Sequence, residues 1–472
     1  MEKRKLPHLA FLPGLEDLRL RYKHAYYQWQ KGLVDVMAEE SEVRREQKKL
    51  AKQIASDPLW SKKFSRWAKK KLDVAPKFAQ RISRYRFERL NNLQLLGYLQ
   101  KLHEGMREAI KTVIFLAIDT LLQNDLETYL IKHVKDKKEL LKVIESITSP
   151  VEISANVEQQ LDFIKICREC EKKKAITPGI KKDLVKHIED YGWVAMDSGH
   201  GEALTYENLK KELKKQTTTQ LAIKEAEIRN DLRRQMQRRE DYLKKLKLPA
   251  RVKGIADYLS QSTFVRTYRR YATSRIAWYS QKFYEEIAKR LDLTMEELVY
   301  LTPNEVYAAL EEQTSVERLR SLSRQNWKYS IGFLDEKGKM NFWVGEKARK
   351  FASKQSTDEE TASGDILHGR PVYLGKATGT AKVVMDSSEL GKVEDGDILV
   401  AMQTPPDYIV VLKKAAGAVV DEGGVTSHAS ILCRECKVPA IIGTRVATKT
   451  YKDGDILTLD STLGVVERIR HV

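Results

Sequence analysis

One histidine in this 472-residue sequence stands in a setting suited to covalent chemistry. His428 lies in the stretch "DEGGVTSHASILCRECKVPAIIG", residues 421–443. An unperturbed imidazole has a pKa near 6.5, so a large fraction is neutral and nucleophilic at neutral pH. Such a side chain can accept a phosphoryl group and become a phosphohistidine. Two glycines and two hydroxyl residues precede it: Gly423, Gly424, Thr426 and Ser427.

The elements around His428 must form a strand, a turn and a helix. "AAGAVV" is apolar up to Val420, "ASILCREC" has helical spacing, and "VPAIIG" returns to a strand pattern. The two glycines permit a tight turn and a close approach of the backbone to a bound group. Ser427 or Thr426 can cap the helix, which places His428 in the first turn, where free N–H groups and the helix dipole favour an anion. The alternative is a plain strand-to-helix turn, in which the hydroxyls only cap and the histidine only packs.

Residues 366–469 resemble the mobile phosphohistidine domain of the phosphoenolpyruvate-utilising enzymes. The resemblance rests on the entry segment "LHGRPVYLGKATGTAKVV", with Gly379 expected to close a turn, on the loop from Thr404 to Asp407, on the Gly-Gly-x-Thr-Ser-His signature, and on "YKDGDILTLDSTLGVV" as a closing hairpin. It implies a swivelling β/β/α domain in which His428 is the catalytic phosphoryl carrier. It also implies that the residues named above support the phosphate: Thr426 and Ser427 beside it, Gly423 and Gly424 in the turn beneath it.

This sequence departs from many relatives at two positions near the helix. Cys433 stands where alanine is common, and Lys437 stands where a glycine follows the helix. Lys437 would then need a left-handed or otherwise compensated conformation.

Four cysteines form two identical "CREC" strings, Cys167/Cys170 and Cys433/Cys436. Each pair could share one helical face, and two such pairs could in principle make a four-thiolate zinc site or a redox pair. About 260 residues separate the pairs, and neither has the flanking glycine or proline of a zinc knuckle. We therefore expect ordinary half-buried helix residues and no metal site.

Positive charge is concentrated outside the histidine region. The net charge is +18, yet residues 361–472 hold 13 Lys and Arg against 14 Asp and Glu. Runs at 61–71, 81–90 and 266–275 interleave aromatic with basic residues, as nucleic-acid surfaces do. Because acids alternate with bases through most of this region, solvated helix faces or a dock for an acidic partner are the favoured alternative.

The periodicity predicts a multidomain α plus α/β protein. Residues 1–325 are expected to form a basic, mostly α-helical domain that binds an acceptor or a partner; 326–345 a β-hairpin; 346–365 a flexible linker; and 366–472 the swivelling domain. The longest apolar run, 112–122, is too short to span a bilayer and contains Asp119. We expect a cytoplasmic protein with no membrane contact.

The helical part resembles, more weakly, the segment preceding the mobile domain in rifampin phosphotransferase-like and phosphoenolpyruvate synthase-like proteins. The matching pieces are 184–213, with His187, Tyr191 and Trp193, and 285–310, with "LTPNE" at 301–305. In the rifampin enzymes the equivalent region binds the acceptor. The alternative is that both aromatics belong to the core.

Full-length relatives also carry an ATP-grasp domain, and residues 1–360 show neither a Gly-rich nucleotide loop nor βαβ alternation. We therefore expect a component of a split phosphotransferase: no cofactor bound by this chain alone, ATP and Mg²⁺ supplied through a separately encoded ATP-grasp subunit, and His428 passing the phosphoryl group to an unknown acceptor. The alternative is a non-catalytic regulatory protein that binds nucleic acid or protein and carries a relic or switch phosphohistidine domain.

Overall fold

The computed structural model describes residues 26–30, 33–37, 40–57, 59–112, 119–195, 204–215, 218–312, 314–334, 340–355, 365–385, 387–404, 408–421 and 428–470. The chain divides into two compact units. The first comprises Met1–Leu122 with Pro150–Gln355, and the second comprises Gln123–Ser149 with Ser356–Val472.

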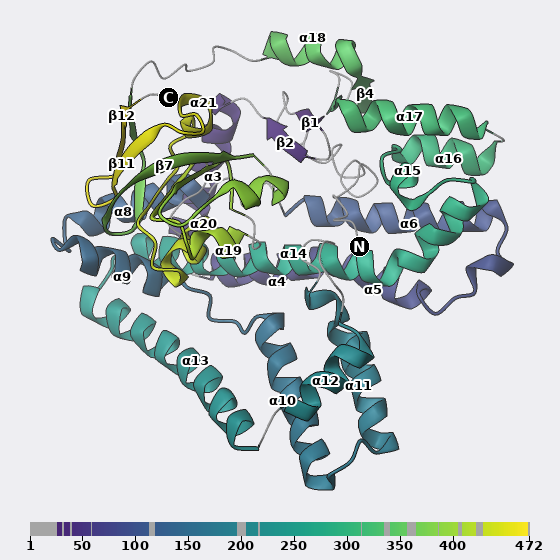
Figure 1. Cartoon of the computed structure of the whole chain (residues 1–472), viewed down its shortest axis with the longest axis horizontal. Coiled ribbons are helices and arrows are strands. Elements are labelled where there is room, and N and C mark those ends of the chain that lie inside the picture. Colours follow the sequence, from purple (N-terminus) through teal and green to yellow (C-terminus); the bar gives the residue numbers. More distant parts are fainter. Residues whose placement is uncertain are drawn as a thin grey trace. The chain divides into compact units, whose positions relative to one another are not determined.

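The first unit is mostly helical, as the sequence predicts (Figure 1). Its α-helices are α3 (Glu40–Ser56), α4 (Trp60–Leu72), α5 (Val74–Ile82), α6 (Asn92–Ile110), the first residues of α8 (Asp119–Ile131), α10 (Ala155–Lys173), α11 (Pro178–Tyr191), α12 (Tyr206–Lys215), α13 (Thr218–Leu246), α14 (Ala250–Arg290), α15 (Met295–Val299), α16 (Pro303–Glu311), α17 (Val316–Lys328) and α18 (Gly345–Gln355). Two 3₁₀ turns join them, η2 (Phe87–Arg89) and η3 (Gly192–Ala195).

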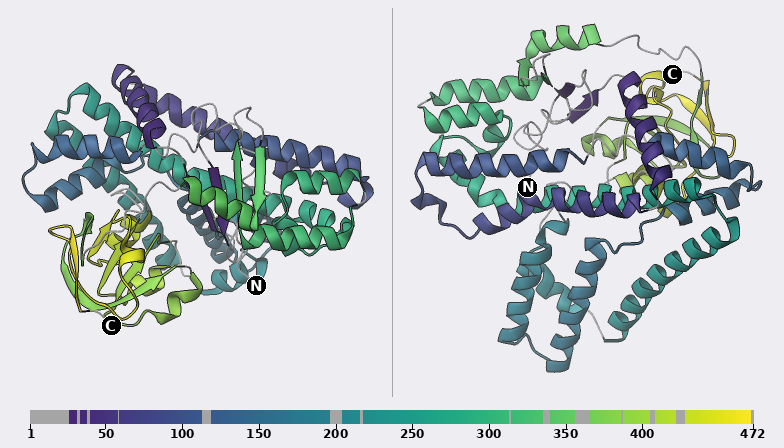
Figure 2. Two further views of the ribbon diagram at one scale, coloured as in Figure 1. Left: turned by 90° about the horizontal axis from the view of Figure 1, so that it is seen from above. Right: turned by 180° about the vertical axis from the view of Figure 1, so that it is seen from behind.

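Helix α14 organises this unit. It runs for 41 residues after Pro249 and packs along α4 and α5 (Figure 2). It ends where Asp292 takes a left-handed conformation with φ of 50°. The amides of Asp292 and Leu293 then bond back to carbonyls of the last turn, which closes the helix. The main core lies between this helix and α6, with Leu99, Phe283 and Ile287 fully buried.

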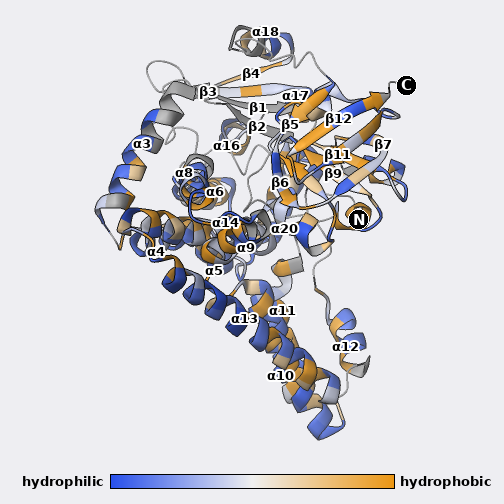
Figure 3. Cartoon of the chain, turned by 90° about the vertical axis from the view of Figure 1, so that its left-hand side faces the viewer, coloured by the Kyte–Doolittle hydropathy of each residue, from blue (hydrophilic) through white to orange (hydrophobic). Residues whose placement is uncertain are grey.

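Helices α10 to α13 build a second core in the same unit. Leu184 and Leu209 pack there with Ile164 and Cys167, so these helices hold together through their apolar faces. The opposite faces are polar, and α13 is largely hydrophilic along its length (Figure 3).

A small antiparallel sheet completes the first unit, in the order β2-β1-β3-β4. Strands β3 (Ser330–Leu334) and β4 (Met340–Val344) pair where the sequence predicts a hairpin. Strands β1 (Tyr26–Gln30) and β2 (Leu33–Met37) come from a region predicted to be mostly helical, and β1 pairs with β3 across about 300 residues. Helix α18 occupies the first part of the segment expected to be linker, so the helical unit extends to Gln355.

The second unit is built on one eight-stranded sheet in the order β5-β12-β11-β7-β8-β9-β10-β6. Its strands are β5 (Ile366–His368), β6 (Arg370–Tyr373), β7 (Lys376–Val384), β8 (Ile398–Ala401), β9 (Gly417–Val420), β10 (Ala440–Ile442), β11 (Ile456–Asp460) and β12 (Val465–Arg470). Its helices are most of α8, α9 (Lys137–Thr148), η4 (Ser387–Lys392), α19 (Ile409–Leu412), α20 (His428–Glu435) and α21 (Ala447–Thr450).

Strands β7 to β10 are parallel, and β8, β9 and β10 are buried along their whole length. A strand covered on both faces reads as a continuous apolar run, and the labelled β9 is hydrophobic in Figure 3. Gly379 lies inside β7, opposite Leu457, so the expectation that it closes a turn is wrong. A Cβ at this position would come within 2.3 Å of the Gly396 carbonyl oxygen, which explains the glycine.

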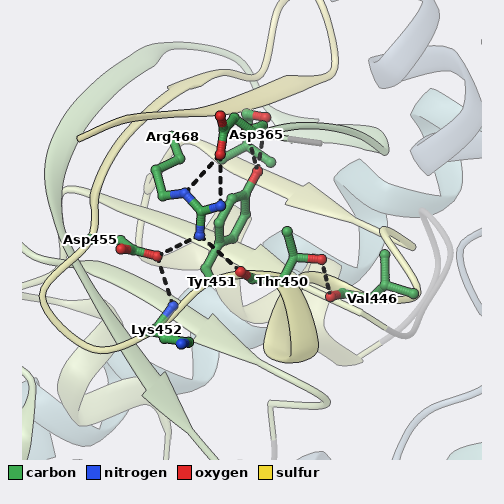
Figure 4. Close-up of polar contacts among 8 residues, drawn as sticks. Asp365, Val446, Thr450, Tyr451, Lys452, Asp455 and Arg468 are labelled. Carbon is green, nitrogen blue, oxygen red and sulfur yellow. Dashed lines mark hydrogen bonds and ion pairs between the residues drawn. The ribbon is translucent and has the colours of Figure 1, made fainter. Parts of the chain in front are cut away.

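Arg468 links the β11–β12 hairpin to Asp365, which lies just before the first strand, β5, of this unit (Figure 4). Arg468 on β12 donates from Nε and Nη2 to Oδ1 of Asp365, over 2.9 and 2.6 Å. Its Nη1 donates to Oδ2 of Asp455 and to the carbonyl of Thr450, both over 2.9 Å. The Tyr451 hydroxyl also donates to the Asp365 carbonyl. The first described residue of the C-terminal segment, Asp365, is therefore fixed to the last strand of this unit.

Within the described part of the chain, we find no helix with the length and apolar character needed to cross a membrane.

Candidate functional site

Helix α20 begins at His428, which is the position that the sequence predicts for this residue. The helix follows the buried strand β9 and leads into β10, and these two strands are parallel. This βαβ arrangement puts the first turn of α20 at the edge of the sheet where the parallel strands end. A residue there has free backbone N–H groups beside it and the positive end of the helix dipole behind it, both of which favour an anion.

The neighbouring strands deliver three further residues to the same edge. Thr404 follows β8, Asp421 follows β9 and Thr444 follows β10, and all three are buried. The backbone N–H of Asp421 donates to the carbonyl of Ala401 over 3.0 Å, which joins the ends of β9 and β8. The edge is therefore a fixed platform from which the segment that leads to His428 departs.

Asp421 stabilises this edge through the hydrogen bonds of its carboxylate. This role was not predicted from the sequence. Its carboxylate accepts from Oγ1 of Thr444 over 2.9 Å and from the backbone N–H groups of Ala447 and Thr448 over 2.5 and 3.1 Å. The hydroxyl of Thr448 donates to Oδ2, the oxygen that also accepts the N–H of Thr448. An acid directly after a fully apolar strand could have indicated this role. Such a carboxylate is expected to be buried, and a buried carboxylate needs several hydrogen-bond donors.

The other end of α20 is closed by Lys437 in a left-handed conformation, with φ of 57°. The N–H of Lys437 bonds to the carbonyl of Arg434 over 3.1 Å, and the N–H of Val438 bonds to that of Cys433 over 3.0 Å. This pair of bonds is the Schellman motif, in which glycine is usual at the left-handed position. The strained conformation that the sequence predicts for Lys437 is confirmed.

The remaining predicted site residues lie outside the described part of the chain. These are Gly423, Gly424, Thr426 and Ser427, together with residues 405–407 of the loop after Thr404. Their role in binding phosphate stays a prediction.

Cys167, Cys170 and Cys433 lie on helices α10 and α20, Cys436 lies in the turn just after α20, and one member of each pair is buried. Burial raises the pKa of the Cys433 thiol to about 12, and it does the same for Cys167. Each buried thiol belongs to the core of its own unit, with Cys170 and Cys436 half-buried beside it. The residues that the structure describes contain no group of three or more His, Cys, Asp or Glu side chains arranged to hold a metal ion.

Several residues of the two helical segments singled out by resemblance have structural roles. "LTPNE" is a helix start: the Thr302 hydroxyl accepts from the N–H of Glu305, and the Glu305 carboxylate accepts from the N–H of Thr302. His187 is a core residue whose ring contacts Asp162 over 2.7 Å and Gln159 over 3.0 Å. These side chains are accounted for by structure alone.

Tyr191 and Trp193 contribute to the lining of a cleft of about 250 Å³ within the helical unit. Trp193 is also a core residue, because it is only 5% exposed and its Nε1 donates to the carbonyl of Asp190. Tyr279 and Arg275 of α14 line it as well. The Arg275 guanidinium lies 5.6 Å from the Trp193 ring centroid and binds Asp73 over 2.7 Å. Lys77, Glu158 and Asp190 complete the lining, so the cleft combines aromatic with charged side chains.

The chain is similar to known proteins over its C-terminal part. The family model described as PEP-utilising enzyme, mobile domain, matches residues 393–464. A probable phosphoenolpyruvate synthase of Archaeoglobus fulgidus is 43% identical over 120 residues, which are 25% of this chain and 16% of that protein. The phosphoenolpyruvate synthase of Pyrococcus furiosus is 43% identical over 115 residues, or 24% of this chain and 14% of that one. The chain therefore spans less than a fifth of the length of these relatives.

Among solved structures, that of Enzyme I (nEIt) is similar over 42% of this chain and 54% of its own, at 16% identity and a TM-score of 0.17.

Proposed function

We propose that this chain, whose residues 393–464 match the family model of the PEP-utilising enzyme mobile domain, is the phosphohistidine-carrying component of a split phosphotransferase. His428 takes a phosphoryl group from a donor site on a separate nucleotide-binding subunit. The domain then delivers this group to an acceptor. The observation that carries the proposal is the start of α20 at His428, at the end of the buried parallel strand β9.

The reaction has two steps, and both conserve the phosphoryl group. In the first, a P–O bond of the donor breaks, a P–N bond to an imidazole nitrogen of His428 forms, and the leaving oxygen keeps the bonding electrons. The ring loses its N–H proton to solvent or a base. In the second, an acceptor oxygen forms a P–O bond as the P–N bond breaks and the ring is reprotonated. Catalysis of this kind depends mainly on positioning and on charge stabilisation.

The chain's own contribution is to position the ring. The hydrogen bonds of Asp421 fix the sheet edge that precedes residues 422–427 in the chain. The left-handed conformation of Lys437 ends α20 on its other side. The first turn of α20 supplies backbone donors and a favourable dipole to the added charge of about −2 on a phosphorylated histidine. ATP and Mg²⁺ belong to the partner subunit in this proposal.

A separate donor is supported by the architecture of the described part of the first unit. Its described strands pair only antiparallel, and its other elements are helices and 3₁₀ turns. A βαβ nucleotide-binding layer is absent from these residues. We place the acceptor at the cleft lined by Tyr191 and Trp193, whose aromatic walls favour a small organic molecule over a macromolecule.

The test is phosphoryl labelling of the full chain. ATP carrying ³²P in its β- and γ-phosphates is added to the chain alone, and then with a co-encoded ATP-grasp protein. We expect no label on the chain alone, and an acid-labile, base-stable label when both proteins are present. His428→Gln should remove the label while the circular dichroism spectrum is unchanged. Label that persists in His428→Gln, or that forms fully without a partner, would overturn the proposal.

A further inference from the structure

A strongly basic strip lies on the helical unit, and only its residues Pro76, Lys77 and Gln80 contribute to the cleft where we place the acceptor. Residues 59–90, which cover α4, α5 and η2, contain eleven Lys and Arg against two acids, Asp73 and Glu88. All of these residues are described. The sequence alone is typical of an ordinary charged helix face. The structure shows which of these cations form ion pairs and which do not.

Four of the eleven cations are neutralised by carboxylates. Lys63 binds Asp57 over 2.7 Å, Lys69 binds Glu152 over 3.1 Å and Lys77 binds Asp73 over 3.1 Å. Lys71 pairs with Glu108. The other seven are all exposed, and no ion pair within the described part of the chain involves them: Lys62, Arg66, Lys70, Arg81, Arg84, Arg86 and Arg89.

The unneutralised cations form a line. Lys62, Arg66 and Lys70 recur every four residues on α4, opposite the face that buries Phe64 and Ala68. Asp73 has helical torsion angles, with φ of −86° and ψ of −13°, so α5 continues almost directly from α4. Arg81 and Arg84 extend the line. At about 1.5 Å per helical residue, the line from residue 62 to residue 84 is roughly 33 Å long.

The other basic run differs, although its sequence looks similar. Arg266 binds the buried Asp119 over 2.8 Å, and Arg275 binds Asp73 and lies over two aromatic rings. Both arginines at the ends of that run are therefore used inside the helical unit. The line on α4 and α5, in contrast, keeps its cations exposed.

We propose that this line binds the phosphate backbone of a nucleic acid. A row of exposed cations about 33 Å long, along which the one intervening acid, Asp73, is already paired with Lys77 and Arg275, is comparable in length to about one turn of a duplex. A protein partner would require an apolar centre depleted of charge, whereas nucleic-acid interfaces are polar and strongly positive. Contacts to phosphates carry no base information, so the binding is independent of nucleotide sequence.

The test is fluorescence anisotropy of the full chain with labelled 20-base-pair RNA and DNA duplexes of two unrelated sequences, over a series of salt concentrations. We expect the logarithm of the association constant to fall linearly with the logarithm of salt, equally for both sequences. The variant K62Q/R66Q/K70Q removes three phosphate contacts. It should weaken binding at least tenfold near 0.1 M salt and flatten the salt slope by about 2 to 3.

A matched control removes the same charge elsewhere in the same unit. Lys181 and Lys182 of α11 and Lys211 of α12 are exposed, so K181Q/K182Q/K211Q should keep the slope and most of the affinity. Equal losses in both variants, or no salt-dependent binding by the unaltered chain, would overturn the proposal. Displacement of the duplex by polyglutamate of equal charge as readily as by unlabelled duplex would instead assign the strip to an acidic protein and overturn it too. His428→Gln should bind normally, which separates this result from the phosphotransfer test.

Discussion

Oγ1 of Thr444 donates to Oδ1 of Asp421 over 2.9 Å, and the two residues stand just beyond the adjacent parallel strands β10 and β9. The same carboxylate accepts two backbone N–H groups at the start of α21. One buried acid therefore holds together the sheet edge from which the segment leading to His428 departs.

Replacing Asp421 by alanine should destabilise the swivelling domain by about 3 kcal/mol, because several buried donors lose their acceptor. Amide hydrogen exchange of peptides from β9 and β10 in the full chain measures this loss. Asp395→Ala is the control: it removes an exposed acid of the same domain and should change the free energy of opening by less than about 0.5 kcal/mol. Similar protection in Asp421→Ala and the unaltered chain would show that this network does not hold the edge.

Lys437→Gly should stabilise the domain by about 1 kcal/mol, because glycine adopts the left-handed conformation without the Cβ penalty. Lys437→Ala is the matched control, since it also removes the lysine side chain but keeps the Cβ. Exchange protection of α20 and β10 should rise in the glycine variant only. If both variants change protection alike, the lysine side chain matters and the backbone conformation does not.

Arg468→Ala should cost about 2 to 4 kcal/mol, because it leaves the buried Asp455 without its guanidinium and releases Asp365 from β12. Lys376→Ala breaks an ion pair with Asp460 whose lysine is 76% exposed, so it should have almost no effect. Hydrogen exchange of β5 and β12 peptides reports both changes. A small effect of Arg468→Ala would mean that the entrance of the domain is held by the β5–β12 pairing alone.

We expect the free energy of unfolding to fall at high pH because of the two buried thiols. The pKa of Cys433 and of Cys167 is raised by burial from 9.0 to about 12, so folding favours the protonated form. Their contribution is fully present below pH 9 and is lost between about pH 9 and 12, as the unfolded chain ionises first. Near pH 8 a maleimide should modify Cys170 and Cys436 and leave the other two intact until the chain unfolds. Rapid labelling of all four in the folded chain would contradict their burial.

Much of the swivelling domain could be predicted from local sequence. The apolar run ending at Val420, the change to helical spacing after His428 and the return to "VPAIIG" are signals of strand, helix and strand, and β9, α20 and β10 follow them. The left-handed Lys437 was predicted differently, from the resemblance, because many relatives have a glycine at this position just after the helix. These features depend on neighbours a few residues apart.

Other features depend on residues far apart in the chain, which is why local patterns missed them. Strand β1 exists because it pairs with β3 across about 300 residues, and Gly379 is required because Gly396 approaches it closely from outside its own strand. The role of Asp421 depends on donors more than 20 residues away. The hydrophobic periodicity of a local segment carries no information about such long-range contacts.

The sequence alone determined the chemistry available to this protein: a histidine at the start of a helix after a glycine pair, and an excess of lysine and arginine confined to the helical part. Only the tertiary structure decided which of those charges matter. Lys63 and Lys62 are neighbours of the same type, yet one is neutralised by Asp57 and the other is exposed with no ion pair to a described residue. The reason is physical: charge is a property of a residue, whereas neutralisation requires an opposite charge within about 4 Å, and folding alone brings the two together.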